Sequence, residues 1–182
     1  MRLKKPLILL VLAASLAGCS SASVPTASPT TTPSAPVAAS ASPATAAKTL
    51  AADGALTALA KFHDYVYMAE TTGTFDEAAM TAFTGQPLLA ITLEGFNSNK
   101  QAGVIMKGPK PISTPTVHSV DLTSTPAKVV IYDCYDDSGL VPLVDGKPLP
   151  VSGARRAENE IDAVGTGADW HIVSAIHKAS SC

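Results

Sequence analysis

The sequence predicts an α+β domain over residues 48–182, in which N-terminal helices pack on a curved antiparallel sheet. Two observations favour this class. Apolar residues recur every three or four positions between Thr49 and Gly103, which is the period of an amphipathic helix. After Gly103 the period changes to two and turn residues multiply, which is typical of antiparallel strands. The length of this region suits one domain with a single core.

Three helices are expected in the first half of the domain. The first covers residues 49–69, where an apolar stripe would face the core. Residues Thr74–Glu77 match a capping box, which favours a short second helix that stops near Gly85. The third helix is expected from Pro87 up to Gly103, because proline is tolerated in the first helical turn.

Strands are expected to follow in the second half. The predicted strands cover residues 104–107, 116–122, 127–135, 154–164 and 170–177. Residues 165–169 are expected to form a compact hairpin between the last two. Residues 136–150 are rich in Gly, Pro and Asp, so a loop is expected between the middle strands.

The start of the chain has the features of an export signal. Basic residues within the first five positions precede an apolar segment over residues 7–14, and a membrane span would need about 20 apolar residues. The segment ends in Leu16–Cys19, and this stretch resembles the lipobox of bacterial lipoproteins. The resemblance implies that residues 1–18 are a signal peptide and that Cys19 carries a diacylglyceryl group. An ordinary secretory cleavage site with a chance cysteine is the alternative.

A lipid on Cys19 would place the protein at the cell membrane, anchored on its extracytoplasmic side. One acyl chain holds a protein at a bilayer only marginally, whereas two hold it stably, and a diacylglyceryl group supplies two. Residues 20–47 consist almost wholly of Ser, Ala, Thr, Pro and Val, without a charge or an aromatic ring. Such a segment cannot bury enough apolar surface to fold, so residues 19–47 are expected to form a lipidated, disordered linker.

The two cysteines of the domain, Cys134 and Cys182, are expected to form a disulfide. Export leads to an oxidising compartment, where an even number of cysteines is normally paired. On the chain-entropy model such a bridge would contribute roughly 4 kcal/mol. Two unrelated buried or free thiols are the alternative.

Charge and apolar patterning exclude some classes of partner. The whole chain has 13 basic and 15 acidic residues, and removal of residues 1–18 leaves 10 basic residues, a net charge of −5. No basic stripe suggests a nucleic-acid partner. No later segment is long and apolar enough to predict a membrane span.

Three stretches carry a resemblance to a known group. They are the helical "KFHDYVYMAETTG", the strand "KVVIYDCYDDSG" and the final "ADWHIVSAIHKASSC". The domain is similar to exported actinobacterial lipoproteins with a nuclear transport factor 2-like fold, a cone of helices against a bent sheet. In relatives of this type a cysteine late in a central strand is matched by one at the chain end. The resemblance also implies a sheet face that allows a homodimer, and it brings no catalytic motif.

Candidate pocket residues come from the helices and the strands of this cone. The candidates are His63, Tyr67, His118 and Trp170. His118 is expected on the strand face of Val120, from which it could reach the interior, although a hydrogen-bonded core histidine is the more frequent role. Trp170 would be a core residue or a ligand platform. The catalytic residues are unknown, no ligand spacing suggests zinc, and no cofactor is expected.

Two charged clusters have simple explanations. Asp133, Asp136 and Asp137 mark a strand end that enters a Gly- and Pro-containing loop, so a solvated turn is favoured over an acid/base or calcium site. Arg155 and Arg156 precede two glutamates in one strand, where ion pairs across the sheet are expected.

Two functional classes remain. The favoured one is a non-catalytic module of the cell envelope that binds an apolar small molecule or a partner protein. The alternative is a small lyase or isomerase of the ketosteroid isomerase or polyketide cyclase type, acting through His63, His118 or an Asp. An enzyme should show at least two titratable groups that converge within about 4 Å of a common point.

Overall fold

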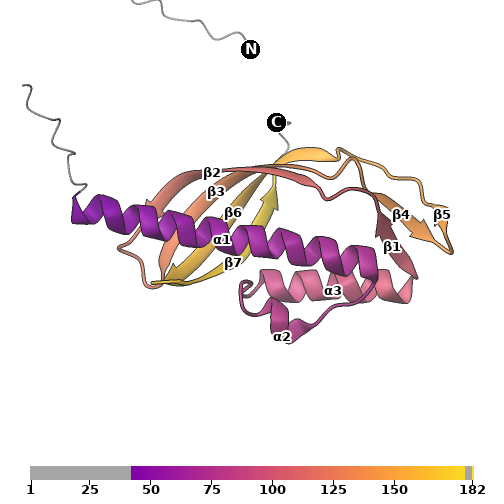
Figure 1. Cartoon of the computed structure of the whole chain (residues 1–182), viewed down its shortest axis with the longest axis horizontal. Helices are drawn as coiled ribbons and strands as arrows, with labels where there is room; N and C mark the ends of the chain where they lie inside the picture. The colour runs from indigo at the N-terminus through magenta and orange to yellow at the C-terminus, as the bar shows by residue number, and fades with distance from the viewer. Residues whose placement is uncertain (1–41, 179–181) are drawn as a thin grey trace, which may run out of the picture. The chain divides into compact units, whose positions relative to one another are not determined.

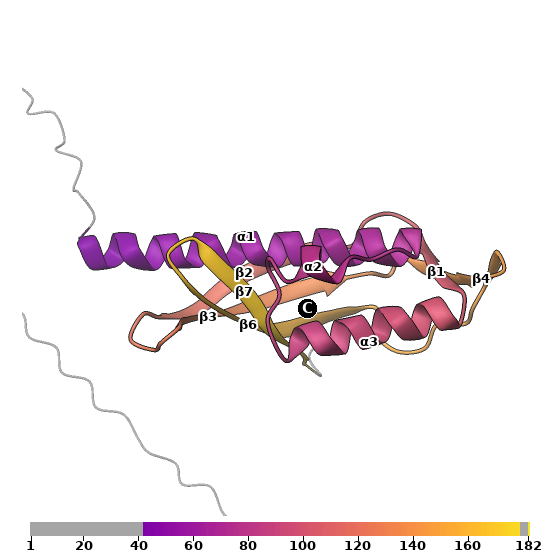
Figure 2. The same ribbon diagram turned by 90° about the horizontal axis from the view of Figure 1, so that it is seen from below.

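The computed structural model describes residues 42–178 and Cys182. Three helices come first in the described chain and seven strands follow, so the predicted α+β class with helices before an antiparallel sheet is confirmed. Figure 1 shows α1 running across the strands, and Figure 2 shows α1 and α3 on the same side of the sheet. The predicted signal peptide, Cys19 and most of the predicted linker lie outside the described residues.

Helix α1 (Pro43–Thr72) is longer than the sequence pattern indicates. Its N-cap is Ser42, whose hydroxyl accepts a hydrogen bond from the Thr45 amide, and Pro43 occupies the first turn. The helix therefore begins within the segment expected to be a linker, because a good cap precedes a run of alanines. It ends at Gly73, whose left-handed backbone (φ 69°) closes the last turn.

The two shorter helices lie near their predicted positions. Helix α2 (Glu77–Met80) is capped by Asp76, which accepts hydrogen bonds from the Ala78 and Ala79 amides. The predicted capping box placed the cap at Thr74, two residues too early. Helix α3 (Leu88–Gln101) begins directly after Pro87, as expected.

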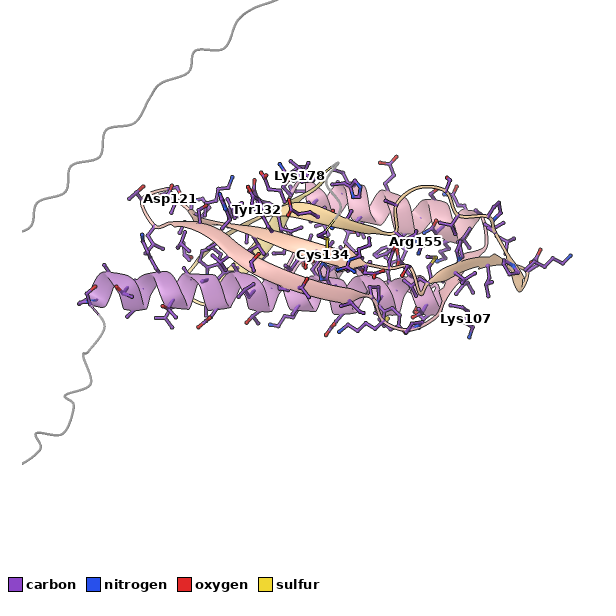
Figure 3. The ribbon with its side chains drawn as sticks, turned by 90° about the horizontal axis from the view of Figure 1, so that it is seen from above. Lys107, Asp121, Tyr132, Cys134, Arg155 and Lys178 are labelled. Atoms are coloured by element: carbon purple, nitrogen blue, oxygen red, sulfur yellow. A yellow bond between two sulfur atoms is a disulfide. The ribbon has the colours of Figure 1, made fainter. Side chains whose placement is uncertain are left out.

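The main sheet is antiparallel, with the strand order β2-β3-β6-β7. Its strands are β2 (Ile112–Asp121), β3 (Ala127–Asp136), β6 (Arg156–Thr166) and β7 (Asp169–His177). On β3 the buried Val129 and Ile131 face the helices, and Tyr132 and Cys134 alternate with them on the opposite face (Figure 3). A bulge in β2 leaves His118 as an extra residue between the Val117–Ile131 and Ser119–Val130 pairs.

A second, small sheet occupies part of the region that was expected to be a loop. Strand β1 (Val104–Lys107) pairs with β4 (Val141–Val144), and β4 pairs with β5 (Lys147–Pro148). The prediction of a plain loop over residues 136–150 was therefore wrong. The backbone turns at Asp145 and Gly146, both with positive φ, and this turn joins two strands too short to show a clear period.

One hydrophobic core lies between the helices and the main sheet. Its members come from α1, α2, α3 and strands β3, β6 and β7, and the largest fully buried ones are Leu59, Met80, Ile131, Ile161 and Ile172. The disulfide between Cys134 and Cys182 is confirmed, with a Cα–Cα distance of 5.7 Å across 48 residues of sequence. It fixes the last residue of the chain to β3 in the main sheet.

Candidate functional site

A large groove, here called the α1 groove, lies between the first half of α1 and the tips of two hairpins. It has a volume of about 910 Å³. One wall is α1 from Ala47 to Lys61, and the other is formed by residues 122–127 and 165–170, which connect β2 to β3 and β6 to β7. Ala82 and Phe83, just after α2, also line the groove, so four segments that are far apart in sequence form one site.

Trp170 is part of the groove and is held between two glycines. A β-carbon on Gly54 of α1 would lie 2.4 Å from Trp170 Cδ1, and one on Gly165 of β6 would lie 2.7 Å from Trp170 Cδ2. The indole Nε1 donates a hydrogen bond to the Gly167 carbonyl oxygen at 3.0 Å. The ring is thus closely packed against both glycines and hydrogen-bonded at its polar edge, and little of it is exposed.

The groove is mainly apolar, and its charges do not favour an anion. Leu50 on α1 is 69% exposed, and Leu122 beyond β2 is also exposed, so aliphatic surface faces the opening from both walls. The charged residues among its lining are Asp53, Lys61 and Asp169, two acidic and one basic. An uncharged apolar molecule fits this lining better than a carboxylate or a phosphate.

A second cavity, here called the His63 pocket, lies farther along α1 and has a volume of about 500 Å³. Leu56, Ala60 and His63 line it from α1, at spacings that place them on one helix face. Residues 110–115, at the start of β2, and Tyr135 of β3 line the other side. Asp64 and Lys110, both at this pocket, form an exposed ion pair.

Asp133 lies beside the His63 pocket and has no exposed surface. Its Oδ1 accepts a hydrogen bond from the Ser113 hydroxyl at 2.9 Å, whereas its Oδ2 has no hydrogen-bond partner. The His63 Nε2 atom lies 3.7 Å from Oδ2, outside hydrogen-bond distance. A buried carboxylate with one unpartnered oxygen is costly, and such groups are enriched at functional sites.

The imidazole of His63 is neutral near neutral pH. Burial lowers the pKa of His63, and the neighbouring Asp133 carboxylate opposes this shift only in part. The Tyr135 ring lies next to the imidazole, with 4.7 Å between the ring centroids. Burial also raises the pKa of Tyr135, so its hydroxyl keeps its proton.

Another acid with a shifted pKa, Glu70, is half-buried and lies two helical turns after His63 on α1. Burial raises the pKa of Glu70 to about 7, with a further contribution from the Asp137 carboxylate and an opposing one from Arg155. Arg155 donates from Nε to Asp137 Oδ1 at 2.6 Å and from Nη2 to the Leu140 carbonyl oxygen at 3.1 Å. The arginine is therefore bound mainly to the loop and leaves Glu70 poorly compensated.

The structure does not bring the four predicted pocket residues together. His63 lines the His63 pocket and Trp170 lines the α1 groove. The Tyr67 hydroxyl donates a hydrogen bond to the Gly108 carbonyl oxygen at 3.0 Å, which joins α1 to the segment before β2. His118 is exposed and stacks on Tyr132, because the β2 bulge turns it away from the interior.

Two interpretations of charged residues need correction. Asp133 is not part of a solvated turn, because β3 continues past it and its side chain is on the buried face; Asp136 caps a turn by accepting from the Ser138 amide. The expected ion pair across strands of the sheet is not what Arg155 forms, because Arg155 lies just before β6 and pairs with Asp137 of the loop after β3. The residue that sequence reasoning missed as a functional candidate is thus Asp133.

The proximity of His63 and Asp133 satisfies the distance expected of an enzyme, but only one of the two groups can contact a bound molecule. Asp133 has no exposed surface, and a general acid or base must lie within hydrogen-bond distance of its substrate. The catalytic alternative therefore stays a prediction.

Comparison with known proteins identifies no family. No family model and no curated protein matches the chain. Among solved structures it is similar to the intermembrane space region of the chloroplast protein ARC6, with 15% identity and a TM-score of 0.48, over 71% of this chain and 97% of that one. The likeness to nuclear transport factor 2-like lipoproteins stays a prediction. Between residues 42 and 178, none of the helices combines the length and apolar composition of a membrane span.

Proposed function

We propose that this chain is a non-catalytic binding module of the cell envelope, which holds an uncharged apolar molecule in the α1 groove. The observation that carries the proposal is the groove itself. Its volume of about 910 Å³ lies within the roughly 300–1,000 Å³ typical of small-molecule sites. Its lining is mainly apolar, and its wall includes an indole that is closely packed against two glycines.

Exposed aliphatic side chains at the groove support the same function. Leu50 lies at the groove and is exposed to water, which is unfavourable for an aliphatic side chain. Burial of such a side chain by a ligand would contribute about 1.5–3 kcal/mol to binding. The polar groups at the groove are few, which is the usual composition of a site that selects for shape and apolar surface.

We further propose that the domain works outside the cytoplasm, tethered through a lipid on Cys19. The Cys134–Cys182 disulfide supports an oxidising compartment, where such bridges persist. The lipobox-like sequence at Leu16–Cys19 supports the anchor. A domain tethered in this way would meet apolar molecules that leave or enter the membrane.

Trp170 provides a direct test of ligand binding, because it is the single tryptophan of the chain and lines the groove. The mature protein is titrated with 11-bromoundecanol, whose bromine quenches indole emission at short range, and with undecanol as the unbrominated control. We expect saturable quenching by the brominated alcohol alone. Absence of saturable quenching would contradict the proposal.

A matched pair of variants tests whether the ligand binds in the groove. Leu50→Glu puts a charge on the groove wall, whereas Ile91→Glu puts one on α3 at a similarly exposed aliphatic residue outside the groove lining. Leu50→Glu should weaken the affinity for 11-bromoundecanol, measured from the quenching titration, roughly tenfold. This change corresponds to the loss of one buried aliphatic contact. Equal weakening by both variants would place the alcohol elsewhere.

A further inference from the structure

A fully buried carboxylate, Asp133, lies beside the His63 pocket, and its Oδ2 atom has no hydrogen-bond partner. Asp133 is fully buried, and within the described chain the nearest group that could carry a positive charge is the His63 imidazole, 3.7 Å from Oδ2. Burial keeps that imidazole neutral near neutral pH. The Asp64 and Lys110 charges at the same pocket pair with each other, so they nearly cancel.

The groups that surround the Asp133 carboxylate also line the pocket. Its lining includes His63, Ser113 and Tyr135. The Ser113 hydroxyl donates a hydrogen bond to Asp133 Oδ1, and the Tyr135 ring lies against the His63 imidazole. The remaining walls are largely apolar, with Leu56, Ala60 and the residues that lead into β2. A molecule in the pocket would therefore meet an aromatic ring and the field of a nearby carboxylate in an environment of low dielectric constant.

We propose that the His63 pocket is a binding site for a small organic cation, an ammonium group on a compact apolar body. The Tyr135 ring offers a cation–π contact and the apolar walls accept the alkyl groups. The Asp133 carboxylate lies behind His63 and Ser113 of the pocket lining, so it would attract the cation electrostatically without contacting it. The ligand would provide the positive charge that this buried acid lacks.

The site should lose affinity when His63 becomes protonated. An imidazolium beside Asp133 would neutralise the carboxylate and repel an ammonium group in the pocket. The charged and titratable groups facing His63 are Asp133 and Tyr135 from β3, Asp64 from α1 and Lys110 from the segment before β2. Of these, Asp133 and His63 decide the sign of the field, because Asp64 and Lys110 are paired.

The experiment compares choline with its uncharged isostere 3,3-dimethylbutan-1-ol by calorimetric titration of the mature protein. We expect choline to bind at least roughly tenfold more tightly, because a single uncompensated charge nearby contributes an interaction of this order. Equal affinity for both probes, or no binding of either, would overturn the proposal.

Variants separate the charge from the shape of the pocket. Asp133→Asn keeps a group that can accept from Ser113 and should remove the preference for choline, whereas Asp136→Asn, on the same strand but outside the pocket, should leave it unchanged. Tyr135→Leu should weaken the binding of choline more than the binding of 3,3-dimethylbutan-1-ol. A preference for choline that survives Asp133→Asn would overturn the proposal.

The wild-type protein gives an independent readout if Asp133→Asn does not fold. Choline affinity is followed as the pH is lowered, while the His63 ring protons report its protonation by NMR. The affinity should fall at least several-fold along with the appearance of the imidazolium, also in a Glu70→Gln background that removes the other titrating acid. An affinity independent of His63 protonation would overturn the proposal.

Discussion

Gly54 on α1 lies so close to the indole of Trp170 that a β-carbon at this position would be 2.4 Å from Trp170 Cδ1. The missing side chain brings the helix against the start of β7. This contact therefore positions both walls of the α1 groove, because Gly54 belongs to one wall and Trp170 to the other.

Gly54→Ala should destabilise the protein although it improves helix propensity. Overpacking a core contact typically costs about 1–3 kcal/mol, whereas alanine gains at most about 1 kcal/mol over glycine in a helix. Gly95→Ala is the matched control on α3, because nothing lies within 4 Å of its β-carbon. In denaturant titrations Gly95→Ala should gain stability and Gly54→Ala lose it. A stabilised Gly54→Ala protein would contradict the packing described.

Glu70→Gln should flatten the pH dependence of stability. The folded-state pKa of Glu70 is raised to about 7, above its ordinary value, so its contribution is complete at low pH. As the pH rises from about 4.5 to 7, the unfolded chain ionises first and the free energy of unfolding falls by roughly 3 kcal/mol at most. Above pH 7 the variant should be more stable than wild type.

The control for this prediction is Glu94→Gln, at an exposed glutamate on α3. It should keep the wild-type slope in urea titrations between pH 4.5 and 8. If Glu70→Gln also keeps that slope, Glu70 does not titrate as described.

Loss of the disulfide should lower stability substantially. Cys134 and Cys182 close a loop of 48 residues, for which the chain-entropy model gives about 4 kcal/mol. The double variant Cys134→Ala/Cys182→Ala is compared with the wild-type protein by thermal unfolding without reductant. Unchanged unfolding would show that the bridge does not constrain the unfolded chain.

Cys19→Ala tests the proposed tether without touching the domain. The variant should move from the membrane fraction to the soluble exported fraction, because it loses both acyl chains. Its thermal unfolding should match that of wild type, since Cys19 is not part of the Cys134–Cys182 bridge. Persistence in the membrane fraction would contradict lipidation at this residue.

Patterns that are local in sequence were enough to predict most of the fold. The helix that begins after Pro87 and the strand Val104–Lys107 lie where the proline and the change of period predict them. Strands β4 and β5 were missed because they are short and contain prolines, and β4 depends on pairing with the distant β1. His118 was assigned to the wrong face because a bulge reverses the alternation, and periodicity alone does not reveal a bulge.

The candidate sites were harder to predict than the elements. The α1 groove combines a helix, two hairpin tips and the segment after α2, and only tertiary contacts bring these together. Asp133 was assigned to a solvated turn because aspartate is rarely buried, and only the pairing of β3 on both sides shows that it lies inside. His63 was recognised as a candidate because its spacing placed it on the inner stripe of α1.

The central claim is that an apolar molecule occupies the α1 groove. The most direct measurement is photo-crosslinking of the mature protein with a diazirine analogue of undecanol, followed by mass spectrometric mapping of the labelled residues. We expect labels on residues 47–61 and on the tips at 122–127 and 165–170, displaced by excess undecanol. Labels around Tyr132 on the opposite sheet face, or labels that undecanol does not displace, would contradict the claim.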